Sequence, residues 1–407
     1  MINRSKGQYS GAREAFALWQ QQPDLVYLDS AASCQVPEIV LQRYLDYYRG
    51  EHANAHRGAY PMAQHATELL EQARSYLARW LGTDATQLVF TAGATHSLNL
   101  LAQGLRIDWQ PGDELVVSRA EHHANFLPWQ RLAEQHQLAL RWLDLDPTTG
   151  QLPDDWAEVI GPRCKLVAVT LASNITGQVL PVQAICQRAR SVGAISCVDA
   201  AQAVSALPID VTSLGCDALT FSAHKMYGVT GCGVLYAATS LQSQLDPAWL
   251  GGGMVAQVTP SASQWLAGVQ KYEAGTPNTA AVVACAEAAK WLEEQRQLGL
   301  GDYVQKLADD CVVELRKRPW LKVLPRPSAA LPLFSFFAPA IHAFDIASFL
   351  AEQNIAVRAG SHCAQPLLSH WQHEAVVRVS FGAYNTPADC ERLLAALDEA
   401  YQLFIED

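Results

Sequence analysis

The 407-residue chain lacks several common features, and each absence excludes a class of protein. Its ten cysteines form no Cys-x-x-Cys pair and lie mostly within apolar runs, so we expect reduced, buried and inert thiols. The N-terminal segment has no apolar stretch typical of a signal peptide. No run approaches the roughly 20 apolar residues that a membrane helix needs. We therefore expect a cytoplasmic protein with no membrane partner.

Positive charge is also scarce in this chain. There are 29 lysine and arginine residues against 40 aspartate and glutamate residues, which gives a formal net charge of −11. An acidic chain of this kind disfavours binding to nucleic acid or to an anionic membrane. The sequence contains no internal repeat, low-complexity tract or charge block. Hydrophobic residues make up 50% of the composition, enough for a large core.

Short apolar runs alternate with amphipathic stretches through the first half of the chain. The predicted strands are 88–91, 114–118, 138–143, 166–171, 194–198, 218–222 and 233–236. Strands and helices that alternate at this spacing predict an α/β fold with a mostly parallel central sheet. On such sheets, ligands bind at the carboxyl ends of the strands.

The pattern changes around the glycine run 251–253 and predicts a smaller α+β domain in the second half. We expect helices from 278 to 298, from 303 to 316 and from 386 to the end, with short strands at 333–337, 355–358 and 376–380. We place the large domain at residues 21–262. The small domain then comprises residues 1–20 and 263–407.

Polar side chains follow five of the predicted strands. They lie in the segments 93–95, 121–125, 173–177, 199–202 and 222–225. Taken singly, each segment has an ordinary explanation, such as a helix cap, a turn or a surface loop. Their joint occurrence at the ends of successive strands favours a cofactor site instead.

The residue types in these segments suit an aldehyde cofactor that carries a phosphate. Partial burial lowers the pKa of a lysine such as Lys225, and the free amine condenses with an aldehyde. Asp199 at a strand end would keep a pyridine nitrogen protonated, because an opposite charge at contact shifts a pKa by about 1–3 units. The helix start at Gly93-Ala94-Thr95 offers backbone donors to a phosphate.

These segments resemble the class V aminotransferase-like group of fold-type I pyridoxal-phosphate (PLP) enzymes. Within that group the chain resembles the cysteine desulfurases, in the branch that contains the SUF-system desulfurase and the cysteine sulfinate desulfinase. The matching segments are YLDSAA (27–32), AHRG (55–58), EHHAN (121–125), SNITG (173–177), VDAAQ (198–202), SAHKMYG (222–228), LGGG (250–253), EAGTPN (273–278), RAGSHCAQPL (358–367) and RVSFGAYNT (378–386). They cover nearly the whole chain.

The resemblance implies a role for each matching residue. The residues implied to hold PLP are Lys225 (Schiff base), Asp199 (ring nitrogen), His123 (ring stacking and proton transfer), Asn174 and Gln202 (phenolic oxygen), and Thr95, Ser222 and His224 (phosphate). Thr276 is implied to reach the phosphate held by the other subunit of a homodimer. The residues implied to bind the substrate are Arg378, which grips its carboxylate, and Arg358, His56 and Asn174.

Cys363 is the exception to the expectation of inert thiols, because it lies in a polar segment. The resemblance implies that its thiolate receives the sulfur, and Arg358 and His362 are close enough in sequence to favour the thiolate. The compact segment predicts a short, ordered loop and a dedicated sulfur-acceptor protein. Relatives often carry a glutamate where this chain has His96, so a role for that carboxylate is not expected here.

We therefore predict a PLP-dependent enzyme that converts L-cysteine to L-alanine, leaves a persulfide on Cys363, and also accepts cysteine sulfinate and selenocysteine. No metal site is expected. Another class V enzyme, such as an aminotransferase or a kynureninase-like lyase, would share Lys225 and Asp199 without needing Cys363. A non-catalytic PLP-binding sulfur-relay subunit is the second alternative. The sulfur could feed iron–sulfur clusters, selenium metabolism or another thio-product.

Overall fold

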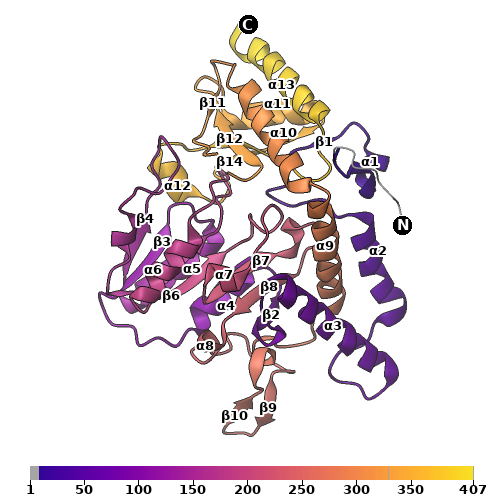
Figure 1. Ribbon diagram of the computed structural model, residues 1–407, viewed down its shortest axis with the longest axis vertical. Coiled ribbons are helices and arrows are strands. Elements are labelled where there is room, and N and C mark those ends of the chain that lie inside the picture. Colours follow the sequence, from indigo (N-terminus) through magenta and orange to yellow (C-terminus); the bar gives the residue numbers. More distant parts are fainter. Residues whose placement is uncertain (1–8, 329, 407) are drawn as a thin grey trace.

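Two β-sheets organise residues 9–328 and 330–406, the part of the chain that the computed structural model describes. The larger sheet has seven strands, and the smaller has four. In Figure 1 the smaller sheet lies above the larger one, on the side of the C-terminus. Two further pairs of short strands, β1 with β13 and β9 with β10, complete the sheets of this part of the chain.

The seven-stranded sheet has the order β2-β8-β7-β6-β5-β3-β4. Its strands are β2 (Leu88–Thr91), β3 (Glu114–Ser118), β4 (Ala139–Leu143), β5 (Cys164–Thr170), β6 (Ile195–Asp199), β7 (Ala218–Ser222) and β8 (Gly233–Ala237). Strands β4, β3, β5, β6 and β7 run parallel, and β8 is antiparallel to both of its neighbours. The predicted α/β fold with a mostly parallel sheet is confirmed.

Helices cover both faces of this sheet, which explains why its strands read as continuous apolar runs. Leu115 and Val117 of β3 enter a core shared with α4 (Ala94–Gly104) and α5 (Leu127–His136). Val116, between them, enters the main core on the opposite face. That face is covered by α3 (Pro61–Trp80), α6 (Val182–Ser191), α7 (Val211–Leu214) and α9 (Thr279–Gln297).

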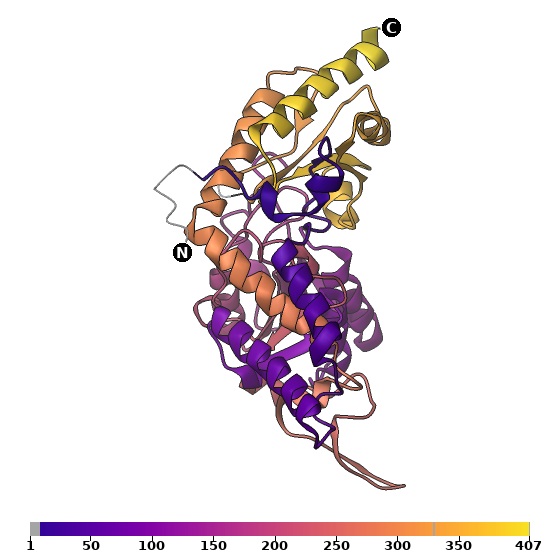
Figure 2. The ribbon, with the colours of Figure 1, turned by 90° about the vertical axis from the view of Figure 1, so that its right-hand side faces the viewer.

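Helix α9 is the long predicted helix of the second half, and it packs against α3 and α2 (Glu38–Asp46). Figure 2 shows these three helices side by side along the molecule. Small side chains of α9 are buried along most of its length, because it lies between these two helices and the main core. None of the helices in the described residues is long and apolar enough to cross a membrane.

The four-stranded sheet is antiparallel, with the order β11-β12-β15-β14. Its strands are β11 (Lys322–Val323), β12 (Leu333–Phe337), β14 (Arg358–Gly360) and β15 (Val376–Ser380). The helices packed around it are α10 (Leu300–Leu315), α11 (Ala343–Glu352) and α13 (Pro387–Tyr401). A capping box between Thr386 and Asp389 starts α13, as the Thr-Pro signal predicted.

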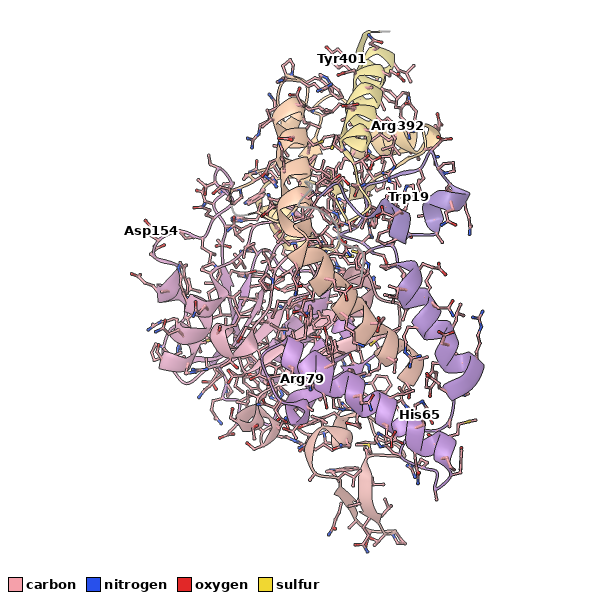
Figure 3. All side chains as sticks on the ribbon, turned by 45° about the vertical axis from the view of Figure 1, so that its right-hand side comes forward. Trp19, His65, Arg79, Asp154, Arg392 and Tyr401 are labelled. Atoms are coloured by element: carbon pink, nitrogen blue, oxygen red, sulfur yellow. The ribbon has the colours of Figure 1, made fainter. Side chains whose placement is uncertain are left out.

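The start of the chain is joined to this C-terminal part. Strand β1 (Val26–Tyr27) pairs in parallel with β13 (Ile355–Ala356), and Arg392 of α13 donates to the Asp24 carbonyl (2.6 Å). Figure 3 shows Trp19, in α1 (Leu18–Gln21), on the same side of the molecule as Arg392. The remaining α-helices and strands are α8 (Thr239–Gln242), α12 (Gln365–His370) and the hairpin of β9 (Val255–Val258) and β10 (Ser263–Trp265).

One predicted strand, 355–358, is two strands in the structure. Strand β13 pairs with β1, whereas β14 begins at Arg358 and pairs with β15 in the other sheet. The chain therefore changes partners within this short run, which an apolar pattern alone does not indicate. The division into a large domain of residues 21–262 and a small domain of residues 1–20 and 263–407 stays a prediction.

Candidate active site

A cavity of about 200 Å³ lies at the carboxyl ends of β5, β6 and β7. Ten residues predicted from the sequence line it: Thr95, Asn174, Asp199, Gln202, Ser222, His224, Lys225, Arg358, Cys363 and Arg378. They come together because parallel strands end at one edge of the large sheet, while the smaller sheet brings its own residues to the same edge. Thr170 and His122, which were not assigned a role from the sequence, also line the cavity. So does His362, which was predicted to favour the Cys363 thiolate.

The cavity is lined by His122, whereas His123, which we predicted to stack on the cofactor ring, is not among the lining residues. Both belong to the turn after β3 that leads into the short 3₁₀ helix η4 (His123–Asn125). The backbone N–H of His123 donates to the Cys363 carbonyl (2.8 Å). The prediction selected the right segment, but the conformation of this turn decides which of two adjacent imidazoles enters the cavity.

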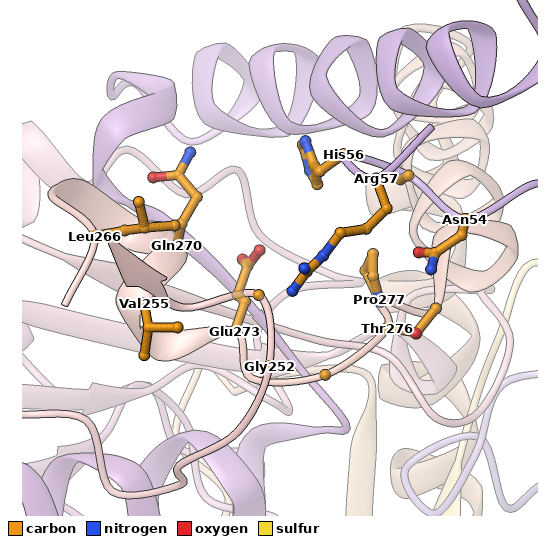
Figure 4. A pocket seen from close by; sticks show the side chains of 13 residues that line it. Asn54, His56, Arg57, Gly252, Val255, Leu266, Gln270, Glu273, Thr276 and Pro277 are labelled. Carbon is orange, nitrogen blue, oxygen red and sulfur yellow. The ribbon is translucent and has the colours of Figure 1, made fainter. Parts of the chain in front are cut away.

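His56 and Thr276 lie in a different pocket, of about 570 Å³. Figure 4 shows them around this second pocket together with Arg57 and Glu273. Its walls also include the glycine loop 252–253. These two predicted residues are therefore not brought to the cavity of their own chain.

Lys225 ends the 3₁₀ turn η6 (Ala223–Lys225), directly after the buried strand β7. Burial lowers the pKa of Lys225 to about 8, while the opposite charge of Asp199 acts against this shift and Arg378 adds to it. The unprotonated amine that condensation with an aldehyde requires is therefore more abundant near neutral pH than it is for an ordinary lysine.

Asp199 is the last residue of β6 and is only 4% exposed. Its carboxylate accepts a hydrogen bond from the Ala201 N–H (2.9 Å). Burial raises the pKa of Asp199, and the hydrogen bond from Ala201 and the charge of Lys225 lower it. A cationic ring nitrogen next to this carboxylate would offset the cost of burying its charge.

The start of α4 forms a cradle of hydrogen-bond donors suited to a phosphate. The Ala94 N–H donates to Ser222 Oγ (2.8 Å), which leaves the Ser222 hydroxyl proton free for another acceptor. His224 is neutral, because burial lowers its pKa to about 4. Gly233 permits the close approach of β8 to this turn, since a Cβ at Gly233 would lie 2.4 Å from the Gly93 Cα. The cradle offers donors and a helix N-terminus to an anion.

Arg378, in β15, is almost completely buried at the substrate side of the cavity. Its guanidinium donates to Asp29 Oδ1 (3.1 Å) and to the Asn174 carbonyl (3.1 Å). Within the described residues, the buried Arg378 Nε and Asn174 Oδ1 have no hydrogen-bond partner. Unpaired buried polar atoms are costly, and a polar ligand in the cavity would give these two atoms a partner.

Cys363 lies in a short loop with an unusual backbone. His362 and Cys363 both have positive φ angles, 51° and 55°, which cost about 1 kcal/mol or more for such residues. Their carbonyl groups are held by Asn174 Nδ2 (2.8 Å) and by the His123 N–H (2.8 Å), respectively. The loop is thus short and fixed at both carbonyls.

The exposure of Cys363 differs from that of the other cysteines. Cys363 is partly exposed, and the other nine are free and buried, as expected. His362 is not a cation, because burial lowers its pKa to about 3 and Arg378 acts in the same direction. The suggestion that His362 favours the Cys363 thiolate as a positive charge is therefore wrong. The same role for Arg358, which also lines the cavity, stays a prediction.

The residues of the cavity fit PLP. They provide a lysine with a lowered pKa, a buried carboxylate for a pyridine nitrogen, and a donor cradle for a phosphate. The imidazole of His122 is neutral, because burial lowers its pKa to about 4. Its Nδ1 accepts from the Ala124 N–H (3.1 Å), so its proton is on Nε2.

Comparison with known proteins gives one consistent result. A model of the aminotransferase class-V family matches residues 26–393. Probable cysteine desulfurases from Vibrio cholerae and Pseudomonas aeruginosa are 38% and 40% identical, and each match covers 93% of this chain and 94% of the relative.

Solved structures agree with these sequence matches. The cysteine desulfurase CsdA from Escherichia coli is 38% identical, with a TM-score of 0.88, and the match covers 97% of this chain and 98% of CsdA. A cysteine desulfurase from Thermococcus onnurineus is 32% identical, with a TM-score of 0.90, over 95% of this chain and 96% of that one. The resemblance stated from the sequence is confirmed, and the chain belongs to the aminotransferase class-V family and, within it, to the cysteine desulfurases.

Proposed function

We propose that this PLP-dependent cysteine desulfurase converts L-cysteine to L-alanine in the cavity described above and takes the sulfur onto Cys363. The observation that carries the proposal is that Lys225, Asp199, Arg378 and Cys363 line one cavity. Two of them suit cofactor chemistry, and two suit a cysteine substrate. The other class V activities have no need for Cys363.

The roles of the cofactor-side residues follow from their chemistry. Bound PLP supplies an electron sink for the charge that develops at the substrate α-carbon. Asp199 holds the proton on the ring nitrogen, and the Lys225 amine takes the proton from the α-carbon. His122, in place of His123, would lie against the ring of bound PLP as a neutral imidazole, with its Nε2–H available as a hydrogen-bond donor.

The roles of the substrate-side residues complete the reaction. Arg378, with Arg358 nearby, binds the carboxylate. The Cys363 thiolate attacks the substrate sulfur, so an S–S bond forms while the Cβ–S bond breaks. The electron pair of the broken bond stays on Cβ, which takes up a proton and becomes the methyl group of alanine. The proton held by the Lys225 amine returns to the substrate, so that the α-carbon of alanine again carries a hydrogen. The sulfur remains on Cys363 as a persulfide, ready for an acceptor protein.

A homodimer is part of the proposal, and it rests on the second pocket. Thr276 and His56 lie there, away from the cavity of their own chain. In the dimer they would complete the site of the other subunit, with Thr276 at the phosphate.

Cysteine sulfinate and selenocysteine are proposed as further substrates of this cytoplasmic enzyme, because their leaving groups depart more readily and depend less on Cys363.

Replacing Cys363 with serine tests the proposal directly. The purified variant is given cysteine or cysteine sulfinate, and alanine, sulfide and keto acid are measured. We expect alanine release from cysteine to be lost and release from cysteine sulfinate to persist. Unchanged alanine release from cysteine would remove the persulfide role, and a keto acid as the main product would favour an aminotransferase.

A further inference from the structure

Glu121 is a fully buried carboxyl group that the proposed reaction does not use. It follows β3 and precedes His122, but it does not line the cavity. Three donors converge on it: the Ser118 hydroxyl, the Thr170 N–H (2.7 Å) and the Asn125 side-chain amide (2.6 Å). One side chain therefore joins the end of β3, the end of β5 and the turn η4.

The orientation of the Asn125 amide is fixed by a second buried side chain. Trp129 Nε1 donates to Asn125 Oδ1 (2.9 Å), and an indole N–H can only donate. The Asn125 oxygen must therefore face Trp129, and its NH₂ group must face Glu121. Because Thr170 N–H meets one carboxyl oxygen and Asn125 meets the other, both oxygens of Glu121 face N–H donors.

The groups tied by Glu121 lead directly to the cofactor side of the cavity. In η4, the Ala124 N–H donates to His122 Nδ1 (3.1 Å), and the Asn125 N–H donates to the His122 carbonyl (2.8 Å). On the other side, Thr170 is the register partner of Asp199 in the sheet. Fixing Asn125 and Thr170 therefore fixes the turn that presents His122 relative to the strand end that carries Asp199.

The charge surroundings of Glu121 are unusual for a buried acid. Within the described residues, no lysine, arginine or histidine forms an ion pair with it. Burial raises the pKa of Glu121 to about 8, its three hydrogen bonds lower it, and Asp199 raises it further. A buried acid without a cation is costly, and the three hydrogen bonds to Glu121 offset part of that cost.

We infer that Glu121 is a positioning residue for the cofactor, which acts by holding the His122 imidazole in place against the PLP ring. This inference rests on the proposed role of His122. A glutamine at this position cannot substitute, because its NH₂ group would face either the Thr170 N–H or the Asn125 NH₂. One buried donor would lose its acceptor, and the turn η4 would move.

A double-mutant cycle between Glu121 and His122 tests the inference. Glu121→Gln, His122→Ala and the double variant are prepared as apoproteins, and the PLP dissociation constant and the visible circular dichroism of bound PLP are measured. We expect Glu121→Gln to weaken PLP binding on the order of tenfold in the parent and less than about twofold in the His122→Ala background. The visible circular dichroism of Glu121→Gln and of the double variant should fall to the level of His122→Ala.

Glu114→Gln is the matched control, because Glu114 is a buried glutamate at the other end of β3, where Arg163 pairs with it (3.0 Å). It should leave both readouts unchanged in either background. If Glu121→Gln does not fold, Ser118→Ala removes one donor and is expected to weaken binding about threefold, again only when His122 is present.

The inference would be overturned if Glu121→Gln, or Ser118→Ala, weakened PLP binding equally in the parent and in the His122→Ala background. Parent-like PLP binding and dichroism of Glu121→Gln would also overturn it. Failure of the proposed function is distinguished by the single His122→Ala variant. If that variant alone keeps parent-like binding and dichroism, the stacking role of His122 itself is wrong.

Discussion

The two halves of the cavity are built differently. On the large-sheet side, Asp199 and Ser222 end regular parallel strands, and Lys225 follows one of them within a single turn. On the small-sheet side, Cys363 lies in a loop with two successive positive φ angles, and Arg378 is held by contacts with Asp29 and Asn174 far away in the sequence.

This difference separates the proposed tasks. Regular strand ends fix the cofactor side by the geometry of the sheet itself. The substrate side depends on long-range hydrogen bonds, so single changes there should alter substrate handling and leave PLP binding intact. Changes on the large-sheet side should affect the cofactor first.

The largest effect is expected from Lys225→Ala on the cofactor side. The amine that condenses with PLP is removed, so alanine release from cysteine should fall about 1,000-fold or more. The bound cofactor should also lose its visible absorption band. Lys271→Ala is the control, because Lys271 is a partly buried lysine that donates to the Gln242 carbonyl (3.1 Å), outside the cavity. Parent-like turnover by Lys225→Ala would contradict the assignment.

Cys363→Ala should affect the reactions of cysteine and of cysteine sulfinate differently and leave PLP binding unchanged. We expect alanine release from cysteine to fall about 100-fold and release from cysteine sulfinate to change less than about threefold. The visible spectrum of bound PLP should stay that of the parent. Cys216→Ala, at a buried thiol outside the cavity, serves as the control. A similar loss with both substrates would show that the loop acts on the cofactor as well.

Arg378→Lys should raise the KM for cysteine without weakening PLP. Lysine keeps the charge but loses the planar fork, which we expect to raise KM about 10- to 100-fold. Steady-state kinetics and a PLP titration of the apoprotein measure the two quantities. A large increase in the PLP dissociation constant would erase the distinction between the two halves.

The smallest effect concerns pH and the uptake of the cofactor. The pKa of Lys225 is lowered to about 8, and only the unprotonated amine attacks the aldehyde. The rate at which the apoprotein binds PLP should therefore rise about tenfold between pH 7 and pH 9, with a midpoint near this pKa. Stopped-flow absorbance measures the rate. A midpoint near the ordinary lysine pKa would mean that burial does not activate this amine.

The sequence was most informative for functional residues that lie at the ends of parallel strands. Asp199, Ser222 and Lys225 were predicted to meet because they follow parallel strands, and they do line one cavity. The class of fold and the family also followed from motifs that cover nearly the whole chain. These features depend on local pattern and on the order of the elements.

Side-chain placement within a turn was not predictable in the same way. His122 and His123 are adjacent and chemically identical, and only the backbone of η4 decides which one enters the cavity. The neutral state of His362 arises from burial by segments distant in the sequence. The segment 121–125 was singled out, but nothing indicated a role for Glu121 itself, because its three donors converge only after β3 and β5 pair.

The most direct test of the account is a single turnover with cysteine, followed by mass spectrometry of the digested protein. The holoenzyme is mixed with one equivalent of cysteine in the absence of an acceptor or reductant. We expect the peptide that contains Cys363 to gain one sulfur atom and an equal amount of alanine to be released. Sulfur on a different cysteine, or alanine release without any sulfur on the protein, would contradict the central claim that Cys363 receives the sulfur.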